Sequence, residues 1–95
     1  MAVTVLIPSY LRPFTDGRSR VPLVGQSRTL AEAVRELWEL HPGLRDRLLT
    51  EQGEVRRHVN IFVGERHMRD TGGFDTPLSD ACEIMIVPNV AGGLP

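Results

Sequence analysis

Few side chains in this sequence are placed for catalysis. Cys82 is the only cysteine, and no histidine lies near it in the sequence. A free cysteine at the start of an apolar run is more often a small buried residue than a nucleophile. His41, His58 and His67 lie far apart, without the spacing or the cysteine partner of a zinc site. The carboxylates form no pair suited to acid and base catalysis. The sequence therefore predicts a protein that is not an enzyme and holds no metal or cofactor.

The other candidate for chemistry is the C-terminal stretch VPNVAGGLP. A Gly-Gly pair also occurs at Gly72 and Gly73, where turn-forming neighbours and positive φ angles explain it. Gly92 and Gly93 differ, because no predicted element follows them. A segment without side chains loses entropy when it is ordered and adds nothing to a core. We therefore interpret this tail as a segment that threads a carboxylate through a narrow channel into another protein's active site.

Composition limits the classes of function. The 95 residues suit one domain, and 41% hydrophobic with 24% charged residues is an ordinary globular composition. A net charge of −1 predicts no binding to nucleic acid or to an anionic membrane. All basic residues are arginine, which excludes a Schiff-base lysine. The N-terminal apolar run is too short to span a membrane, and one cysteine gives no disulfide framework, so we expect a cytoplasmic protein.

Apolar stretches rich in β-branched residues predict the strands that position the tail. Asp16 and Gly17 give a turn signal between the first two of them, which should form a hairpin. Pro22 marks the second as an edge strand. Residues 66–81 are dense in Gly, Asp, Pro and Thr and are expected to be mostly turn. The predicted strands are residues 3–8, 19–25, 58–65 and 82–88.

One main helix is predicted between the second and third strands. Thr29 and Glu32 have the spacing of a capping box, in which each side chain satisfies a free backbone amide. Apolar residues then recur at helical spacing until Pro42 ends the helix. A further short helical turn is expected where Leu44 and Leu48 lie four residues apart.

This order of elements predicts an α+β fold. Short connections place the helix on one face of a mixed sheet of about four to five strands, which is the ubiquitin-like β-grasp arrangement. We assign residues 1–88 to this domain and residues 89–95 to a flexible C-terminal tail. The strand period of two and the helix period of 3.6 predict the residues that fill the space between sheet and helix. These are Val3, Val5, Ile7, Leu30, Val34, Leu37, Val59, Ile61, Ile84 and Ile86.

A second apolar set alternates away from this core. Leu6, Phe62, Met85 and Val87 should point to the other face of the sheet, where no helix is predicted. Exposed apolar residues that gather beside a functional tail are typical of a protein-binding surface. We therefore expect a partner protein to dock there.

The second half of the sequence carries an ordered set of motifs. These are Val-Asn at residues 59–60, Thr-Pro-Leu-Ser-Asp at residues 76–80, an apolar strand that ends at Pro88, and Val-Ala-Gly-Gly at residues 90–93. In this set the chain resembles the sulfur-carrier proteins of the ThiS/MoaD type, and among them the CysO-like carriers. A weaker resemblance continues over the first half. Many relatives have Asp-Gly-Asp where this chain has Asp-Ala-Cys at residues 80–82.

The resemblance implies a carrier of sulfur. In the family an E1-like enzyme uses ATP to adenylate the terminal glycine, here Gly93, which then becomes a thiocarboxylate. Val90, Ala91 and Gly92 would thread the enzyme's channel. A carboxylate needs this activation because it resists nucleophilic attack until one oxygen becomes a leaving group. A synthase would accept the sulfur, and the product stays open between cysteine, thiamine, molybdopterin, thiolated tRNA and a sulfur-containing secondary metabolite.

Leu94 and Pro95 separate this chain from that pattern, because they block the Gly93 carboxylate. The resemblance to extended carriers implies a JAMM-type zinc peptidase that cleaves between Gly93 and Leu94. The alternative for this extension is a cloning remnant or natural drift in an inactive paralogue. The alternative function is a ubiquitin-like interaction module whose tail is never activated.

Overall fold

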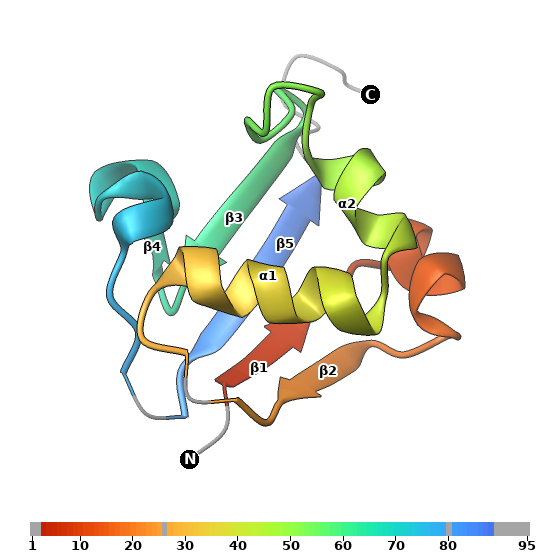
Figure 1. Cartoon of the computed structure of the whole chain (residues 1–95), viewed down its shortest axis with the longest axis horizontal. Helices are drawn as coiled ribbons and strands as arrows, with labels where there is room; N and C mark the ends of the chain where they lie inside the picture. The colour runs from red at the N-terminus through yellow and green to blue at the C-terminus, as the bar shows by residue number, and fades with distance from the viewer. Residues whose placement is uncertain (1–2, 26, 80, 89–95) are drawn as a thin grey trace.

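A mixed sheet with helices packed on one face makes up the fold (Figure 1). The computed structural model describes residues 3–25, 27–79 and 81–88. The strands are β1 (Val3–Leu6), β2 (Arg20–Leu23), β3 (Val59–Val63), β4 (Arg66–His67) and β5 (Glu83–Pro88). The α-helices are α1 (Leu30–Leu40) and α2 (Gly43–Leu48), and the 3-10 helices are η1 (Ser9–Thr15), η2 (Met68–Asp70) and η3 (Gly73–Asp75).

The sheet has five strands in the order β2-β1-β5-β3-β4. β1 pairs antiparallel with β2 and parallel with β5, and β3 pairs antiparallel with both β5 and β4. β1 and β5, the first and last strands that the structure describes, are therefore neighbours in the middle of the sheet. This topology confirms the predicted β-grasp fold, the first hairpin and the edge position of the strand that contains Pro22.

The start of α1 is held in two ways. The Thr29 hydroxyl accepts a hydrogen bond from the Glu32 N–H at 3.3 Å, as the capping box predicted. The Glu32 carboxylate accepts from the Arg28 N–H at 2.7 Å, one residue earlier than a capping box requires. Residues 28–30 are also tied to residues 76–78, because the Leu30 N–H donates to the Thr76 carbonyl at 2.9 Å. The helix is thus fixed against the segment that leads into β5.

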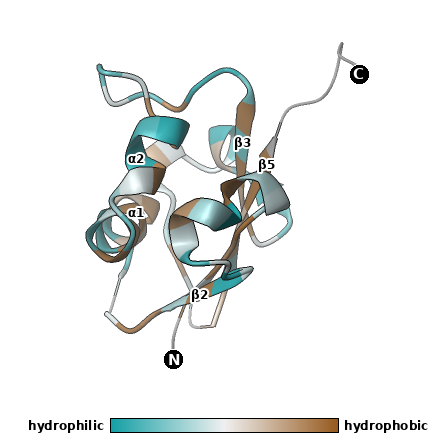
Figure 2. Cartoon of the chain, turned by 90° about the vertical axis from the view of Figure 1, so that its right-hand side faces the viewer, coloured by the Kyte–Doolittle hydropathy of each residue, from teal (hydrophilic) through white to brown (hydrophobic). Residues whose placement is uncertain are grey.

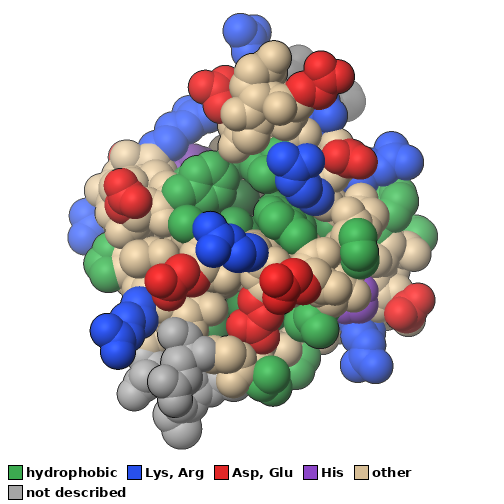
Figure 3. Space-filling model, viewed as in Figure 1, with side chains coloured by type: hydrophobic (Ala, Val, Ile, Leu, Met, Phe, Trp, Pro, Cys, Tyr) green, Lys and Arg blue, Asp and Glu red, His purple; other side chains and the backbone are tan. Residues whose placement is uncertain are grey.

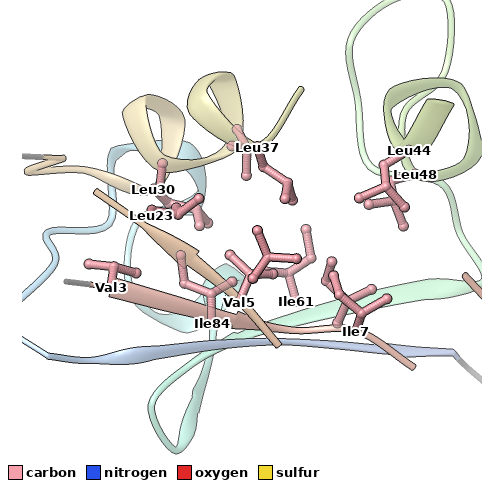
Figure 4. Packing of buried hydrophobic residues seen from close by; sticks show 14 of the residues in the cluster. Val3, Val5, Ile7, Leu23, Leu30, Leu37, Leu44, Leu48, Ile61 and Ile84 are labelled. Atoms are coloured by element: carbon pink, nitrogen blue, oxygen red, sulfur yellow. The ribbon is translucent and has the colours of Figure 1, made fainter. Parts of the chain in front are cut away.

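The core lies between the sheet and the helices, which sit on the same side of it (Figure 2). All the residues predicted from the two periodicities are buried, and Figure 4 shows Leu30 and Leu37 above Val5 and Ile84. α2 forms where the second helical turn was predicted, and it contributes Leu44 and Leu48. The core also includes Leu11, Val21, Leu23, Ala33 and Met68.

Two parts of the fold differ from the prediction. β1 and β2 are joined through η1 rather than by a tight turn alone, although Asp16 and Gly17 do adopt positive φ angles of 57° and 82°. η1 is held by the buried Thr15 hydroxyl, which donates to the Arg18 carbonyl at 2.8 Å. The segment predicted as mostly turn also contains the two-residue strand β4.

The helices are short. Over the described part of the chain, none has the length and apolar character needed to cross a bilayer.

Candidate functional site

The outer face of the sheet carries a continuous row of side chains across its strands. Met85 on the central strand β5 stands opposite Leu6 of β1 on one side and opposite Phe62 of β3 on the other. Val87 follows two positions along β5 and therefore lies on the same face. Met85 is 39% exposed, and the other three side chains are half-buried. The structure thus brings together the apolar residues for which a docking role was predicted.

Polar groups border this apolar row on both sides. Arg20, opposite Leu6, contacts the Glu83 carboxylate at 3.3 Å across an exposed stretch of the face. On the other side, His67 stands opposite Phe62, and their rings meet edge to face at 5.1 Å. An apolar centre with a polar rim is the usual composition of a protein-binding surface. We call Leu6, Phe62, Met85 and Val87 the docking face.

His67 is held in one orientation by two hydrogen bonds. Its Nδ1 accepts from the Arg69 N–H at 3.1 Å, so the proton lies on Nε2, which donates to the Asn60 Oδ1 at 2.9 Å. The ring is thereby fixed against Phe62 and helps to hold that side chain in place. The sequence presents His67 only as a candidate metal ligand, because its contact with Phe62 depends on the pairing of β3 with β4.

The tail begins at the edge of this face. Pro88, the last residue of β5, stands opposite Val59, the first residue of β3. Arg57, which is exposed, lies two residues before Val59 and places a positive charge near the start of the tail. The predicted tail and cleavage-site residues Val90, Ala91, Gly92, Gly93 and Leu94 lie outside the described residues.

The remaining candidates for chemistry show no arrangement that supports catalysis. Burial raises the pKa of the Cys82 thiol, although backbone hydrogen bonds partly oppose this effect. A raised pKa keeps the thiol protonated and weakens it as a nucleophile. Among residues 3–25, 27–79 and 81–88, no group of three or more His, Cys, Asp and Glu side chains could hold a metal ion.

The helix-bearing face has its own surface features, which the sequence did not predict (Figure 3). A hollow of about 480 Å³ opens beside β3, with Val55, Ile61, Met68 and Phe74 among its apolar lining residues. Elsewhere on this face, the Glu36 carboxylate accepts hydrogen bonds from the backbone of residues 24 and 25 and so ties the end of β2 to α1. The tail starts beside the docking face, which therefore remains the better candidate for a surface that works with it.

Comparison with known proteins places the chain in a family. The profile of the ThiS family matches residues 5–93. The chain belongs to the ThiS family. This membership confirms the resemblance drawn from the motifs of the second half and its weaker continuation over the first half. The match includes both glycines of the tail and stops before Leu94.

The similar ThiS-family proteins include the sulfur carrier protein CysO of Mycobacterium tuberculosis. The two sequences are 38% identical over 95 residues, which cover 98% of this chain and 100% of CysO. The crystal structure of M. tuberculosis CysO matches with a TM-score of 0.83 and 34% identity, over 93% of this chain and 99% of that chain. CysO in the BexX/CysO complex of Amycolatopsis orientalis matches with a TM-score of 0.84 and 34% identity, over 97% and 100% of the two chains.

Proposed function

We propose that this protein is a sulfur carrier whose activated group is the carboxylate of Gly93. The observation that carries the proposal is the extent of the family match, which runs from residue 5 to Gly93 and leaves out Leu94 and Pro95. The identity to CysO supports it, because that relative is itself named a sulfur carrier. The fold supports it as well, since the tail follows directly from β5, the central strand of the sheet.

The chemistry takes place in four steps, each catalysed by a partner. A JAMM-type zinc peptidase first hydrolyses the bond between Gly93 and Leu94. An E1-like enzyme then joins a Gly93 carboxylate oxygen to the α-phosphate of ATP, with release of pyrophosphate. Sulfide then attacks the acyl carbon, the bond from that carbon to the AMP oxygen breaks, and AMP leaves, which gives the thiocarboxylate. A synthase finally accepts the sulfur. The chain itself contributes the acyl carbon and the docking face.

A second candidate function is an interaction module whose tail is never activated. It is favoured by one observation, the apolar docking face with its polar rim, because a surface of this composition can bind a partner whether or not sulfur is transferred. The BexX/CysO complex supports the general idea that such carriers bind other proteins. The two functions differ in whether the Gly93 carboxylate is freed and activated.

Intact-mass measurement on protein from its native host distinguishes the two functions. We expect the carrier to have lost Leu94 and Pro95, with a fraction about 16 Da heavier where sulfur replaces one carboxylate oxygen. A tail that remains intact in every growth condition, including sulfur limitation, would contradict the carrier and favour the interaction module.

A charge on the docking face should weaken activation. Phe62→Glu places a carboxylate in the apolar row, where a docked partner would have to desolvate it. We expect adenylation of residues 1–93 to fall at least about tenfold in kcat/KM, the size of effect seen at interface hot spots. Circular dichroism should show an unchanged fold.

The matched control for this change is Val24→Glu, because Val24 is apolar, 87% exposed and outside the docking face. It should leave adenylation within about twofold of the original value. If Phe62→Glu is adenylated as fast as this control, the docking face has no part in activation.

A further inference from the structure

An apolar hollow lies beside β3 on the helix-bearing face of the sheet. Its volume is about 480 Å³, and Figure 3 shows hydrophobic side chains gathered in a depression on this face, with charged side chains around them. The buried residues Val59 and Ile61 of β3 form its floor. Its walls include Val55, Met68 and Phe74. We call this site the β3 hollow.

Hydrogen bonds hold the walls of the β3 hollow in place. On one side, the loop that carries Val55 is closed by the Thr50 N–H, which donates to the Glu54 carbonyl at 2.7 Å. On the other side, the Thr71 and Thr76 hydroxyl groups share a hydrogen bond of 2.8 Å that ties η2 to the end of η3. The hollow is therefore preformed, and a group that enters it does not have to order the loops around it.

The β3 hollow is continuous with the docking face around the β4 edge of the sheet. His67 lines the hollow, and its ring also meets Phe62 of the docking face. β3 contributes to both surfaces, because its alternate side chains point to opposite faces of the sheet. Val59, in the floor of the hollow, stands opposite Pro88, the last residue before the tail. The two surfaces therefore lie on opposite faces of the sheet, beside the point where the tail begins.

We propose that the E1-like activating enzyme contacts both faces of the sheet and places an apolar side chain in the β3 hollow. This inference rests on the proposed function, because an enzyme that encloses the tail in a channel surrounds the end of β5 from both faces. The rim of the hollow carries one charge of each sign, Glu54 from the loop and Arg69 from η2. The complementary group is a leucine, methionine or aromatic side chain with a basic neighbour toward Glu54 and a carboxylate toward Arg69.

The polar groups of the β3 hollow favour a side chain of a partner protein over a small polar ligand. A site for a small molecule places a few polar groups inside the pocket, where they fix the orientation of the ligand. Over the residues that the structure describes, no buried side-chain nitrogen or oxygen lacks a hydrogen-bond partner. Glu54 and Arg69 are instead exposed, and they border an apolar centre as the rim of a protein interface does.

Methyl NMR of the complex tests the contact directly, because each surface carries a methionine. Residues 1–93 are deuterated except for isotope-labelled methionine and valine methyl groups, and they are bound to the protonated E1-like enzyme without ATP. We expect NOEs from enzyme protons to the Met68 ε-methyl in the β3 hollow and to the Met85 ε-methyl on the docking face. The methyl groups of Val24, which is 87% exposed and outside both surfaces, should receive none.

Reversal of one rim charge gives a second test. Arg69→Glu changes an exposed side chain and leaves in place the backbone N–H that donates to His67. We expect adenylation of residues 1–93 to fall about tenfold in kcat/KM, because two carboxylates would then face each other at the interface. Arg66→Glu is the matched control, since Arg66 is exposed, carries the same charge and lines neither the β3 hollow nor the docking face. It should leave kcat/KM within about twofold of the original value.

These outcomes separate the contact at the β3 hollow from the sulfur carrier itself. NOEs that reach Met85 but not Met68, or Arg69→Glu and Arg66→Glu chains that are adenylated equally fast, would refute the contact at the hollow and leave the carrier intact. A failure of residues 1–93 to form a thiocarboxylate would refute the carrier, even where NOEs to both methionines are observed.

Discussion

Residues 1–95 should gain no sulfur when they are incubated with the activating enzyme, ATP and a sulfide source, whereas residues 1–93 should form a thiocarboxylate. In the longer chain the Gly93 carbonyl is an amide and has no free oxygen to attack phosphate. The carboxylate of Pro95 lies two residues, at most ~7 Å, beyond the required position. A displacement of even about 1 Å can cost 10²-fold in rate, so this carboxylate cannot substitute.

A third form, residues 1–93 with Gly93→Ala, isolates the role of the glycine. Its carboxylate is free, but the added methyl group lies where a passage shaped for backbone has no space. We expect its thiocarboxylate yield to fall strongly relative to residues 1–93, as followed by intact mass. Sulfur gained by residues 1–95 without loss of Leu94 and Pro95, as readily as by residues 1–93, would show that no cleavage is needed.

Leu37→Ala should cost the fold about 2 to 5 kcal/mol of unfolding free energy. Leu37 is 1% exposed and points from α1 into the centre of the core, above the sheet (Figure 4). Truncation removes apolar contacts and leaves a cavity that the surrounding strands cannot fill. Urea unfolding at an unchanged m-value measures the loss, which corresponds to a fall in Tm of roughly 10 °C or more for a domain of this size.

Leu40→Ala is the matched control for this substitution. Leu40 lies on the same helix and is 50% exposed, so the same chemical change removes little buried area. We expect it to alter stability by no more than about 0.5 kcal/mol. A loss below about 0.5 kcal/mol for Leu37→Ala as well would mean that the buried face of α1 is misassigned.

Much of the fold could be predicted from the sequence because two periodicities agree. β-strand alternation in Val3 and Val5 and helical spacing in Leu30 and Leu37 select one common core, and the structure buries all four side chains. η1 could not be predicted in the same way. A 3-10 helix with a proline inside has no extended apolar period, and it is held by a threonine hydroxyl whose partners are backbone carbonyls.

For the candidate site, the sequence predicts the face of the sheet on which each residue lies, but not how the strands align with one another. Alternation alone indicates that Leu6, Phe62 and Met85 point away from the core. Their alignment in one row depends on which residue of β1 stands opposite which residue of β5, and that parallel pairing joins the two ends of the chain. The contact of His67 with Phe62 depends instead on the short hairpin of β3 and β4, and the two residues of β4 are too few to show an alternating pattern.

The central position of β5 has a consequence for synthesis of the protein. β5 is the last strand to be made, and both β1 and β3 need it as a neighbour. The two halves of the sheet therefore remain unjoined until β5 has left the ribosome, and folding has to wait for a contact between distant parts of the chain. Because β5 leads directly into the tail, a chain truncated before β5 can neither complete its sheet nor present a terminal glycine. The order of the strands thus makes formation of the sheet depend on synthesis of the chain through β5.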